Sequence, residues 1–421
     1  MGQVESLRTE NKLKKTEIGE IPVDWEVARI GDTCEVVGGS TPFTTTKEFW
    51  DGDIPWATPT DITKLKGNII SITEKTITER GLSNCAARLL PVGSILLTSR
   101  ATIGECAINS KPMATNQGFA SLICKDKVYN WFIFYRIKYM RKEIERLGSG
   151  STFNEVSKKS MRELKIPIPP LSEQRKIAEI LTSTDEAIDK KQEIIEKTKM
   201  LKKGLMQELF TRGIGHKKFK NTEIGEIPVD WEVKKIKDTG KIITGNTPPT
   251  KNLEYYNNDY LWATPGDLGT SKFIEFTARM LSRKGIKVSR LIPRDSILVV
   301  CIGSTIGKVG MALHDMATNQ QINSIICNKS WNPHFVYYWM LENSDYLVSM
   351  AGKHAVPIIN KTLFSLFSIP NPSKDEQSAI GLILNSLDEE IENEMAHKER
   401  LEGIKKGLMQ VLLTGKIRAK I

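Results

Sequence analysis

An exact internal repeat constrains this chain more than any other feature. The twelve-residue run TEIGEIPVDWEV occupies positions 16–27 and occurs again, letter for letter, at 222–233. An identity of this length does not arise by chance, so the chain contains an internal duplication. The 421 residues therefore form two copies of one unit, which agrees with the two or three domains that this length favours.

The two copies stay in register along the whole chain. Shorter runs recur in the same order, namely WATP (56–59 and 262–265), MATNQ (113–117 and 316–320) and KKGLMQ (202–207 and 405–410). Other segments differ, for example 43–48 against 249–254 and 148–159 against 352–362. We expect the shared runs to form a common scaffold and the differing segments to recognise two different things.

Each copy begins with a segment of mixed character. Short apolar runs rich in β-branched residues, such as 94–98 and 296–300, lie between prolines and glycines, which is typical of strands. A helical pattern covers about 130–146. These patterns predict an α/β (α+β) fold with one globular domain in each copy.

Each copy ends in a predicted long helix. After Pro169 and Pro170, Ser172 is a plausible N-cap, and no further proline occurs before about Phe210. Apolar residues recur every three or four positions between charged ones, and the second copy repeats this pattern over about 374–413. The resulting seam contains Ile177, Leu181, Ile188, Ile195, Leu205, Leu384, Leu387, Ile391, Leu401 and Leu408, and the stripe also includes Leu201, Met395 and Ile404.

A helix of about 38 residues is about 57 Å long, and its narrow apolar stripe needs a partner. The partner that we favour is the long helix of the other copy. This arrangement gives two long antiparallel helices in a coiled coil and a pseudo-twofold relation between the copies. The alternative is that each helix folds back onto its own globular domain. The predicted organisation is a first domain (1–171), a central helix and spacer (172–213), a second domain (214–373) and a final helix and tail (374–421).

Composition narrows the class of protein. The formal net charge of +10 and the isoelectric point near 9.1 favour a polyanionic partner, although a merely basic soluble protein would show the same balance. No apolar stretch is long enough to cross a membrane, and the N-terminal segment lacks the pattern of a secretory signal. The six cysteines form no C-x-x-C pair, and the five histidines show no metal-ligand spacing. We therefore expect a cytoplasmic protein with reduced thiols and no metal.

The order of these motifs resembles the specificity subunit of a type I restriction–modification system. The resemblance rests on IGEIP with Trp25 and their copy, on ATNQ (114–117) and its copy, on IPIPPLSEQ (166–174), and on KKGLMQVLLTG (405–415). It covers essentially the whole chain, although the second copy has IPNPSK at 369–374 in place of the double proline.

The resemblance implies two target recognition domains, each reading one half of a bipartite sequence in duplex DNA. The paired helices would set the half-site spacing and dock the methyltransferase subunits, normally two, which nuclease–translocase subunits join. Catalysis, with S-adenosylmethionine, ATP and Mg, would then lie in the partner subunits, so we expect no cofactor in this chain.

Phosphate contacts use Lys, Arg, Ser, Thr and backbone N–H groups, whereas base reading uses Arg, Lys, Asn or Gln that reach a groove. Loops of this composition in segments that differ between the copies are the DNA-binding candidates, although such loops are often only solvated turns. In the first domain they are Ser40, Thr41, Thr44, Thr45, Lys47, Arg100, Thr102, Ser149, Ser151, Lys158 and Lys159. In the second domain they are Asn246, Thr247, Thr250, Lys251, Ser304, Thr305, Lys353, His354, Asn360 and Lys361.

Arg100 is of special interest, because the second copy has the uncharged residues 302–303 opposite it. The repeated TNQ runs at 115–117 and 318–320 are instead expected to be structural turns, since readers of different half-sites should differ. Trp56 and Trp262 are expected in the core. The lysine runs at 202–203, 217–220 and 405–406 have two interpretations: they complement helix C-termini, or they face DNA or a methyltransferase.

Two other classes of function remain open from sequence. A self-contained modification enzyme would need a glycine-rich cofactor loop and an Asn/Asp-Pro-Pro-aromatic motif, and neither occurs. The loop GSTIGKV (303–309) is one residue short of a phosphate-binding loop. In a structural adaptor that binds only proteins, the divergent loops would have no part in DNA specificity.

Overall fold

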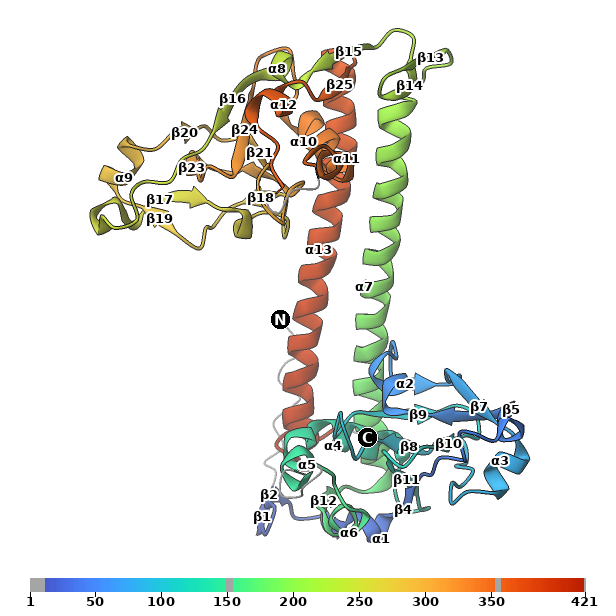
Figure 1. Ribbon diagram of the computed structural model, residues 1–421. Coiled ribbons are helices and arrows are strands. Elements are labelled where there is room, and N and C mark those ends of the chain that lie inside the picture. The colour runs from blue at the N-terminus through green and yellow to red at the C-terminus, as the bar shows by residue number, and fades with distance from the viewer. Residues whose placement is uncertain (1–11, 149–153, 353–356, 420–421) are drawn as a thin grey trace. The chain divides into compact units, whose positions relative to one another are not determined.

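The computed structural model describes residues 12–148, 154–352 and 357–419 (Figure 1). It forms two compact units: unit 1 contains residues 1–193 and 395–421, and unit 2 contains residues 194–394. The divisions fall inside the two long helices, α7 (Leu171–Thr211) and α13 (Lys374–Leu412). Each unit therefore contains one globular domain together with a part of each long helix.

The centre of unit 1 is a five-stranded sheet of order β4-β11-β8-β9-β6. Its strands are β4 (Cys34–Gly38), β11 (Ala120–Cys124), β8 (Ile95–Leu97), β9 (Cys106–Asn109) and β6 (Ile69–Ile70). All neighbours are antiparallel except β6 and β9. Because both faces of the central strand β8 are covered, all three of its residues are apolar and buried.

The two faces of this sheet bury different clusters. Ile95 and Leu97 face a cluster that contains Phe132 and Tyr135 of helix α4 (Asn130–Tyr139) and Ile177 and Leu181 of α7. Leu96 belongs to a smaller cluster on the opposite side. The globular domain is thus packed directly against the helix segment that follows it.

Smaller elements complete unit 1. A three-stranded sheet contains β10 (Ala114–Thr115), β5 (Trp50–Ala57) and β7 (Lys75–Ile77). Two pairs of strands are β1 (Leu13–Thr16) with β2 (Gly19–Pro22), and β3 (Glu26–Arg29) with β12 (Lys165–Ile168). The short helices are α1 (Ile30–Thr33), η2 (Lys47–Phe49), α2 (Pro59–Thr63), α3 (Glu79–Ser83), α5 (Arg141–Gly148) and α6 (Lys158–Glu163).

Unit 2 repeats this topology. Its five-stranded sheet has the order β16-β24-β21-β22-β18, which is the order of unit 1 with each strand replaced by its copy. These strands are β16 (Gly240–Thr244), β24 (Ile322–Cys327), β21 (Ile297–Val300), β22 (Val309–Ala312) and β18 (Phe273–Ile274). The second sheet contains β19 (Met280–Leu281), β17 (Tyr256–Ala263), β23 (Met316–Thr318) and β20 (Leu291–Ile292).

The remaining elements of unit 2 also have counterparts in unit 1. The strand pairs are β13 (Phe219–Thr222) with β14 (Gly225–Pro228), and β15 (Glu232–Lys235) with β25 (Ser368–Asn371). The helical segments are α8 (Ile236–Thr239), η3 (Leu253–Tyr255), η4 (Pro265–Asp267), α9 (Arg283–Lys287), α10 (Pro333–Glu342), α11 (Ser344–Met350) and α12 (Lys361–Ser365). The predicted α/β duplication is confirmed.

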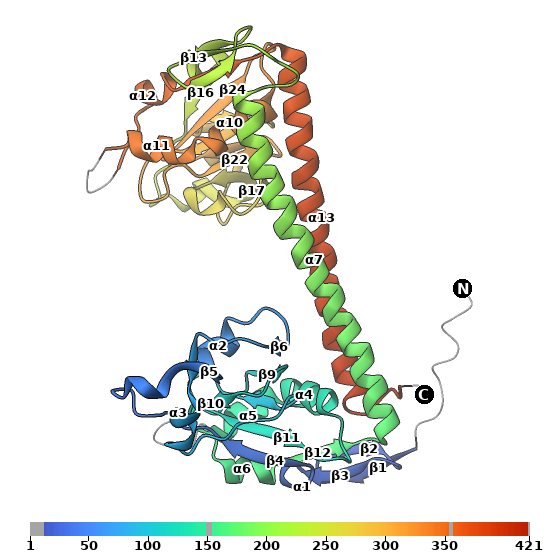
Figure 2. The ribbon, with the colours of Figure 1, turned by 90° about the vertical axis from the view of Figure 1, so that its right-hand side faces the viewer.

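Within each unit the segments of α7 and α13 run antiparallel, and Figure 2 shows them side by side. In unit 1, Asp185 of α7 pairs with Lys405 of α13, while Glu173 near the start of α7 pairs with Arg418 beyond the end of α13. In unit 2, Lys202 pairs with Asp388. Helix α7 begins at Leu171, one residue before the predicted cap Ser172, so Ser172 lies inside the helix and the prediction of its capping role was wrong.

The predicted seam residues are all buried or half-buried, but they do not face only the other helix. Ile177 and Leu181 belong to the core of unit 1, and Leu384 belongs to the core of unit 2. Both interpretations of the stripe therefore hold in part, since the helix segments contact each other and also their globular domain.

Three stripe residues were assigned wrongly: Leu201 is 54% exposed, Ile404 is 49% exposed and Met395 is 43% exposed. At two of these places the next residue, Lys202 or Lys405, points inward instead. Its amino group pairs with an aspartate of the other long helix, Asp388 or Asp185. No helix in the described ranges is long and apolar enough to cross a membrane.

Candidate nucleic-acid interface

Gly39, the residue after β4, lies where the chain passes close to the end of β10 in the second sheet of unit 1. A Cβ atom on Gly39 would overlap the backbone oxygens of Thr115 and Asn116, so only glycine lets the chain pass this closely. Gly245 stands in the same relation to Thr318 and Asn319. The repeated Gly and TNQ motifs therefore build one and the same close crossing in both units.

The TNQ runs have the structural role that their repetition indicates. Asn116 Oδ1 accepts a hydrogen bond from Gly118 N at 2.9 Å, and Asn319 Oδ1 accepts one from Gln321 N at 3.0 Å. The third residue of each run holds the neighbouring loop, because Thr41 donates to Gln117 Oε1 and Thr247 donates to Gln320 Oε1. The threonine hydroxyls are thereby partnered within the protein.

The two tryptophans are buried, as predicted. Trp56 is 4% exposed and Trp262 is 2% exposed. Their indole N–H groups donate to the carbonyl oxygens of Ser40 at 3.0 Å and Asn246 at 3.2 Å. They fix the starts of the candidate loops and do not offer a face on which a base can stack.

A pocket of about 480 Å³ opens beside the glycine crossing of unit 1. It brings together residues from four separate segments: the end of β4, the turn after β8, the turn before β11 and the start of α6. Its lining consists of Gly38, Gly39, Ser99, Arg100, Gln117, Phe119, Glu155, Val156, Ser157 and Lys158. Two sequence candidates, Arg100 and Lys158, are thus brought to one cavity although 58 positions separate them in the chain.

The charges at this pocket have defined positions. Arg100 Nη2 lies 2.8 Å from Glu155 Oε2, in an ion pair that is partly exposed. Lys158 opens helix α6, where Ser157 is the N-cap and its Oγ accepts from Ser160 N at 3.0 Å. The side chain of Lys158 extends over Gly38. A guanidinium, an amino group and a helix N-terminus at one opening suit an anion or the edge of a base.

The matching place in unit 2 has a different chemistry. The backbone bonds from Val156 to Ser99 and from Ile359 to Cys301 show that Glu155 corresponds to Ile358. Ile302 and Ile358 form an isolated β-bridge there, so an aliphatic pair occupies the place of the arginine and glutamate. Lys361, which opens helix α12, retains the position of Lys158. The scaffold is shared, and the polar character of the opening is not.

Of the other candidates, some side chains are exposed, and others are hydrogen-bonded within the protein or buried. Exposed side chains are those of Thr44, Thr45, Lys47, Lys159, Thr250, Lys251, Ser304, Asn360 and Lys361. Asn360 also caps α12 by accepting from Leu363 N at 2.8 Å. Asn246 uses both ends of its amide on Val288 and Arg290, and the hydroxyl of Thr102 is buried inside its turn. Ser40 and Thr305 are half-buried, and Ser149, Ser151, Lys353 and His354 lie outside the described residues.

A second set of polar residues joins the globular domain of unit 1 to its helices. Asp185 of α7 accepts from the hydroxyl of Tyr135 at 2.7 Å and from the amide of Asn68 at 2.7 Å, and it pairs with Lys405 of α13. Burial raises the pKa of Tyr135, so its hydroxyl stays a donor. One carboxylate of α7 thus holds α4, the segment before β6 and α13, and we call this set of contacts a joint.

Unit 2 has the same joint with one substitution. Tyr338 donates to Asp388 Oδ2 at 2.6 Å, and Asp388 pairs with Lys202. Where unit 1 has Asn68, unit 2 has Lys272, whose Nζ lies 2.8 Å from His334 Nδ1 and 3.0 Å from the hydroxyl of Tyr338. Burial lowers the pKa of Lys272 to about 8. Both interpretations of Lys202 and Lys405, as partners of helix C-termini or as part of a binding surface, are wrong, because each lysine pairs with an aspartate of the other long helix.

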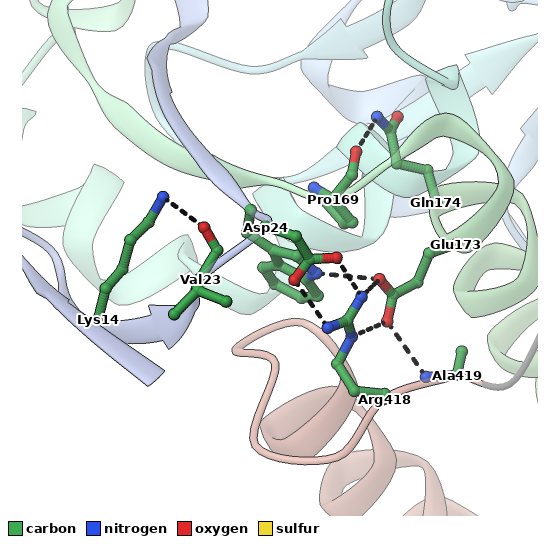
Figure 3. A network of polar contacts seen from close by, with 9 residues as sticks. Lys14, Val23, Asp24, Pro169, Glu173, Gln174, Arg418 and Ala419 are labelled. Atoms are coloured by element: carbon green, nitrogen blue, oxygen red, sulfur yellow. Dashed lines mark hydrogen bonds and ion pairs between the residues drawn. The ribbon is translucent and has the colours of Figure 1, made fainter. Parts of the chain in front are cut away.

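The start of α7 is locked by the segment that follows α13 (Figure 3). Glu173 is 1% exposed, and its two oxygens accept from Arg418 Nε and Nη2, each at 2.7 Å. Trp25 Nε1 donates to the same carboxylate at 2.9 Å. Arg418 also donates to both oxygens of Asp24, at 2.8 and 2.7 Å, and this bond lowers the pKa of Asp24.

Unit 2 repeats this lock with a histidine. Glu376 accepts from Trp231 Nε1 at 3.0 Å, and His216 Nε2 lies 3.0 Å from Glu376 Oε1. His216 comes from the segment that follows α7, as Arg418 comes from the segment that follows α13. Neither the locks nor the joints are among the predicted sites, although the sequence carries a signal for them: Tyr135, Asp185 and Glu173 recur as Tyr338, Asp388 and Glu376. Among the described residues, no cluster of His, Cys, Asp and Glu could hold a metal ion.

The fold and these sites define a class: a duplicated recognition protein whose two α/β domains share their scaffold and their attachment to long helices but differ around one surface pocket. The family model for the type I restriction modification DNA specificity domain matches twice, at residues 22–200 and 228–403. The chain belongs to this family.

Relatives and solved structures agree with this assignment. The specificity subunit of type I restriction enzyme MjaIX from Methanocaldococcus jannaschii is 41% identical over 263 residues, which is 59% of each chain. A second chain of that organism, provisionally named as the specificity subunit of MjaX, is 33% identical over 98% of both chains. The crystal structure of a type I restriction-modification S subunit from M. genitalium has a TM-score of 0.61 at 15% identity and covers 96% of this chain and 98% of that one, which shows a common fold.

Proposed function

We propose that this chain is the non-catalytic specificity subunit of a cytoplasmic type I restriction–modification complex. Each globular domain reads one half of a bipartite target in duplex DNA. S-adenosylmethionine, ATP and Mg act in the methyltransferase and nuclease–translocase partners, and this chain holds no cofactor. Family membership supports the proposal, as do the names of the relatives, which are specificity subunits of type I restriction enzymes.

One observation carries the proposal: the two units keep the same topology and the same glycine crossing, yet differ at the opening of the pocket. Arg100 and Glu155 form an ion pair in unit 1, whereas the corresponding positions of unit 2 hold Ile302 and Ile358. A protein that binds only other proteins through a repeated surface would have no need for this difference. Two readers of unlike half-sites require it, because bases are distinguished by donor and acceptor patterns.

The charge distribution supports a division of work within the pocket. Arg100 occurs in unit 1 alone, so it reads a base edge of one half-site. Lys158 and Lys361 occupy equivalent positions at helix N-termini in both units, so they contact phosphate. Salt dependence follows from this assignment, since each phosphate that a lysine neutralises releases counterions.

The long helices give the proposal a length scale. Helix α7 contains 41 residues and is therefore about 62 Å long. Its central part carries charged side chains on the faces that neither its domain nor the other helix covers, as an assembly surface for methyltransferase subunits would. The helices thus hold the readers and offer a docking surface to the catalytic partners.

The test uses the full chain in complex with its methyltransferase partner and oligonucleotides that carry single changes in either half-site. Arg100→Ala is expected to cost about 1–3 kcal/mol of binding and to relax specificity at positions of one half-site only. Lys158→Ala is expected to weaken binding to all sequences and to reduce the slope of log K against log salt by about 1. Arg88→Ala removes an exposed ion pair with Glu35 away from the pocket and is the matched control.

The outcomes discriminate between the classes of function. Methylation or binding without sequence preference in the assembled complex would refute the reading role. Methyl transfer by the isolated chain would instead show a self-contained enzyme. Unchanged half-site specificity after replacement of residues 16–170 by another recognition domain would favour the adaptor.

A further inference from the structure

Two cysteines face each other across neighbouring strands of unit 1. In the register of β4 and β11, Cys34 lies directly opposite Cys124. The adjacent pair is hydrogen-bonded, because Lys125 N donates to Thr33 O at 2.9 Å. Cys34 and Cys124 therefore occupy a non-hydrogen-bonded position, where facing Cα atoms are about 4.5 Å apart. That separation lies within the range that a disulfide spans.

The two sulfur atoms are already in contact. Cys34 Sγ and Cys124 Sγ are 3.6 Å apart, and one thiol donates to the other. This hydrogen bond from Cys124 lowers the pKa of Cys34, because it stabilises the thiolate. The pair thus gives up its first proton more readily than an isolated buried thiol, and the thiolate is the reactive form.

The pair is accessible from one side only. Cys34 is 1% exposed, whereas Cys124 is half-buried and lines a pocket of about 300 Å³ together with Lys125 and Tyr129. A small oxidant can therefore reach the sulfur of Cys124, and Cys34 stands behind it as the second thiol.

The second copy provides an internal comparison. The strand neighbour of Cys327 in unit 2 is Gly240, and a Cβ atom there would overlap the backbone oxygen of Ile326. The scaffold of unit 2 therefore excludes a second cysteine at this place. Two other cysteines, Cys106 and Cys301, are buried, and burial raises the pKa of each thiol to about 12.

We propose that Cys34 and Cys124 form a reversible disulfide and so make a redox modification site in unit 1. The oxidant class is a low-molecular-weight disulfide. The pair first loses one proton to solvent and shares the other across the contact between the two sulfur atoms. When the shared proton lies on Cys34, the thiolate of Cys124 attacks one sulfur of that disulfide, forms a mixed disulfide and releases one small thiolate. Cys34 then loses this remaining proton, and its thiolate attacks Cys124 Sγ and expels the second small thiolate. Two protein thiols are oxidised and one small disulfide is reduced to two thiols, so electrons and protons balance.

The position of the pair gives the modification a consequence for the pocket of unit 1. Strand β4 continues from Cys34 to Gly38, and β11 starts three residues after Gln117, so both strands lead to the proposed reading pocket. A covalent link between them would hold these strands in one register and twist. This consequence rests on the proposed function, whereas the chemistry of the link does not.

The experiment treats the native full-length chain with oxidised glutathione, blocks remaining thiols with an alkylating reagent, and maps the peptides by mass spectrometry. We expect the Cys34–Cys124 peptide pair to be the principal disulfide, with loss of two of the six thiols and full reversal by dithiothreitol. Cys34→Ser should stop the reaction at a glutathione adduct on Cys124. Cys124→Ser should leave Cys34 a free thiol, because the buried sulfur has lost its accessible partner.

Cys327 is the matched thiol in the same molecule and should take at most a glutathione adduct. Recovery of both Cys34 and Cys124 as alkylated thiols in the wild-type chain would overturn the proposal. A persistent glutathione adduct on wild-type Cys124 would overturn it as well, since ring closure would then have failed. Either result would leave sequence-specific DNA binding by the reduced protein untouched, so the two proposals fail independently.

Discussion

Replacement of Arg418 by methionine tests the lock at the start of helix α7. Methionine retains the length and apolar stem of the side chain but removes the guanidinium, which makes four of the hydrogen bonds to Glu173 and Asp24. The carboxylate of Glu173 then remains buried, at 1% exposure, with the N–H groups of Trp25 and Ala419 as its other partners. A buried charge that has lost its counter-ion is the main cause of the expected destabilisation.

The magnitude follows from the exposure of the two partners. Breaking a fully buried ion pair by removing one partner costs about 3–5 kcal/mol. Arg418 retains 27% side-chain exposure, and the bonds from Trp25 and Ala419 persist, so a value at or below the lower end applies. We expect Arg418→Met to lower the free energy of opening around Glu173 by about 2–3 kcal/mol. Arg418→Met combined with Glu173→Gln should recover most of this loss, because a neutral amide needs no counter-ion and its oxygen still accepts from Trp25.

Native-state hydrogen exchange is the appropriate measurement, because a chain of two units need not unfold in one step. Exchange should accelerate in β2, β3 and the first turns of α7, while the corresponding segments of unit 2 serve as the internal reference. Arg212→Met removes an exposed ion pair with Glu226 and should change exchange by less than about 1 kcal/mol. Equal protection in wild type and Arg418→Met would refute the reasoning, and so would a double variant less stable than Arg418→Met alone.

Three further predictions address other parts of the structure. The pKa of Lys272 is about 8 in the folded chain and near 10.5 when unfolded, so the unfolded state binds more protons between these values and the stability should rise with pH there. Lys272→Asn introduces the residue that unit 1 has and should abolish this rise in unfolding measured at pH 7.5 and 10; an equal rise in both proteins would contradict the assignment. Gly415 has φ +74° and no room for a Cβ beside Pro22 and Trp25, so Gly415→Ala should lower the melting temperature. A Cβ atom on Gly204 of α7 would meet no other atom, so Gly204→Ala should raise the free energy of unfolding by about 0.5–1 kcal/mol. A melting temperature that falls in both glycine variants would show that the turn geometry at Gly415 is not the cause.

The fold was largely predictable from the sequence because the information was local and was present twice. The repeat gave the duplication, and the absence of proline with an apolar residue every three or four positions predicted α7 and α13 nearly to their ends. The TNQ turn and the buried tryptophans followed from the argument that residues identical in both copies serve the scaffold. Each of these inferences needs only neighbouring residues or a comparison of the two copies.

The polar joints were not predictable by the same means. A stripe of apolar residues placed Leu201 and Ile404 inward, whereas the structure turns Lys202 and Lys405 inward toward Asp388 and Asp185. Nothing in the helix sequence alone distinguishes a lysine that meets a carboxylate 186 or 220 positions away from one that faces water. The grouping of Arg100 with Lys158 at one pocket depends in the same way on contacts between distant segments.

The contrast between the joints and the pocket shows where the two copies have kept the same residues and where they have diverged. Tyr, Asp and Lys recur unchanged at the joints, and a glutamate bound by tryptophan recurs at the locks. Each of these carboxylates is buried or largely buried, so losing one of its donors would be destabilising. The pocket opening is partly exposed, so exchanging its ion pair for an aliphatic pair costs little stability. Physical chemistry therefore permits change at the pocket opening, where we propose that a half-site is read, and resists it at the attachment to the helices. A duplicated unit can in this way acquire a second specificity while each domain keeps the same attachment to its helix segments.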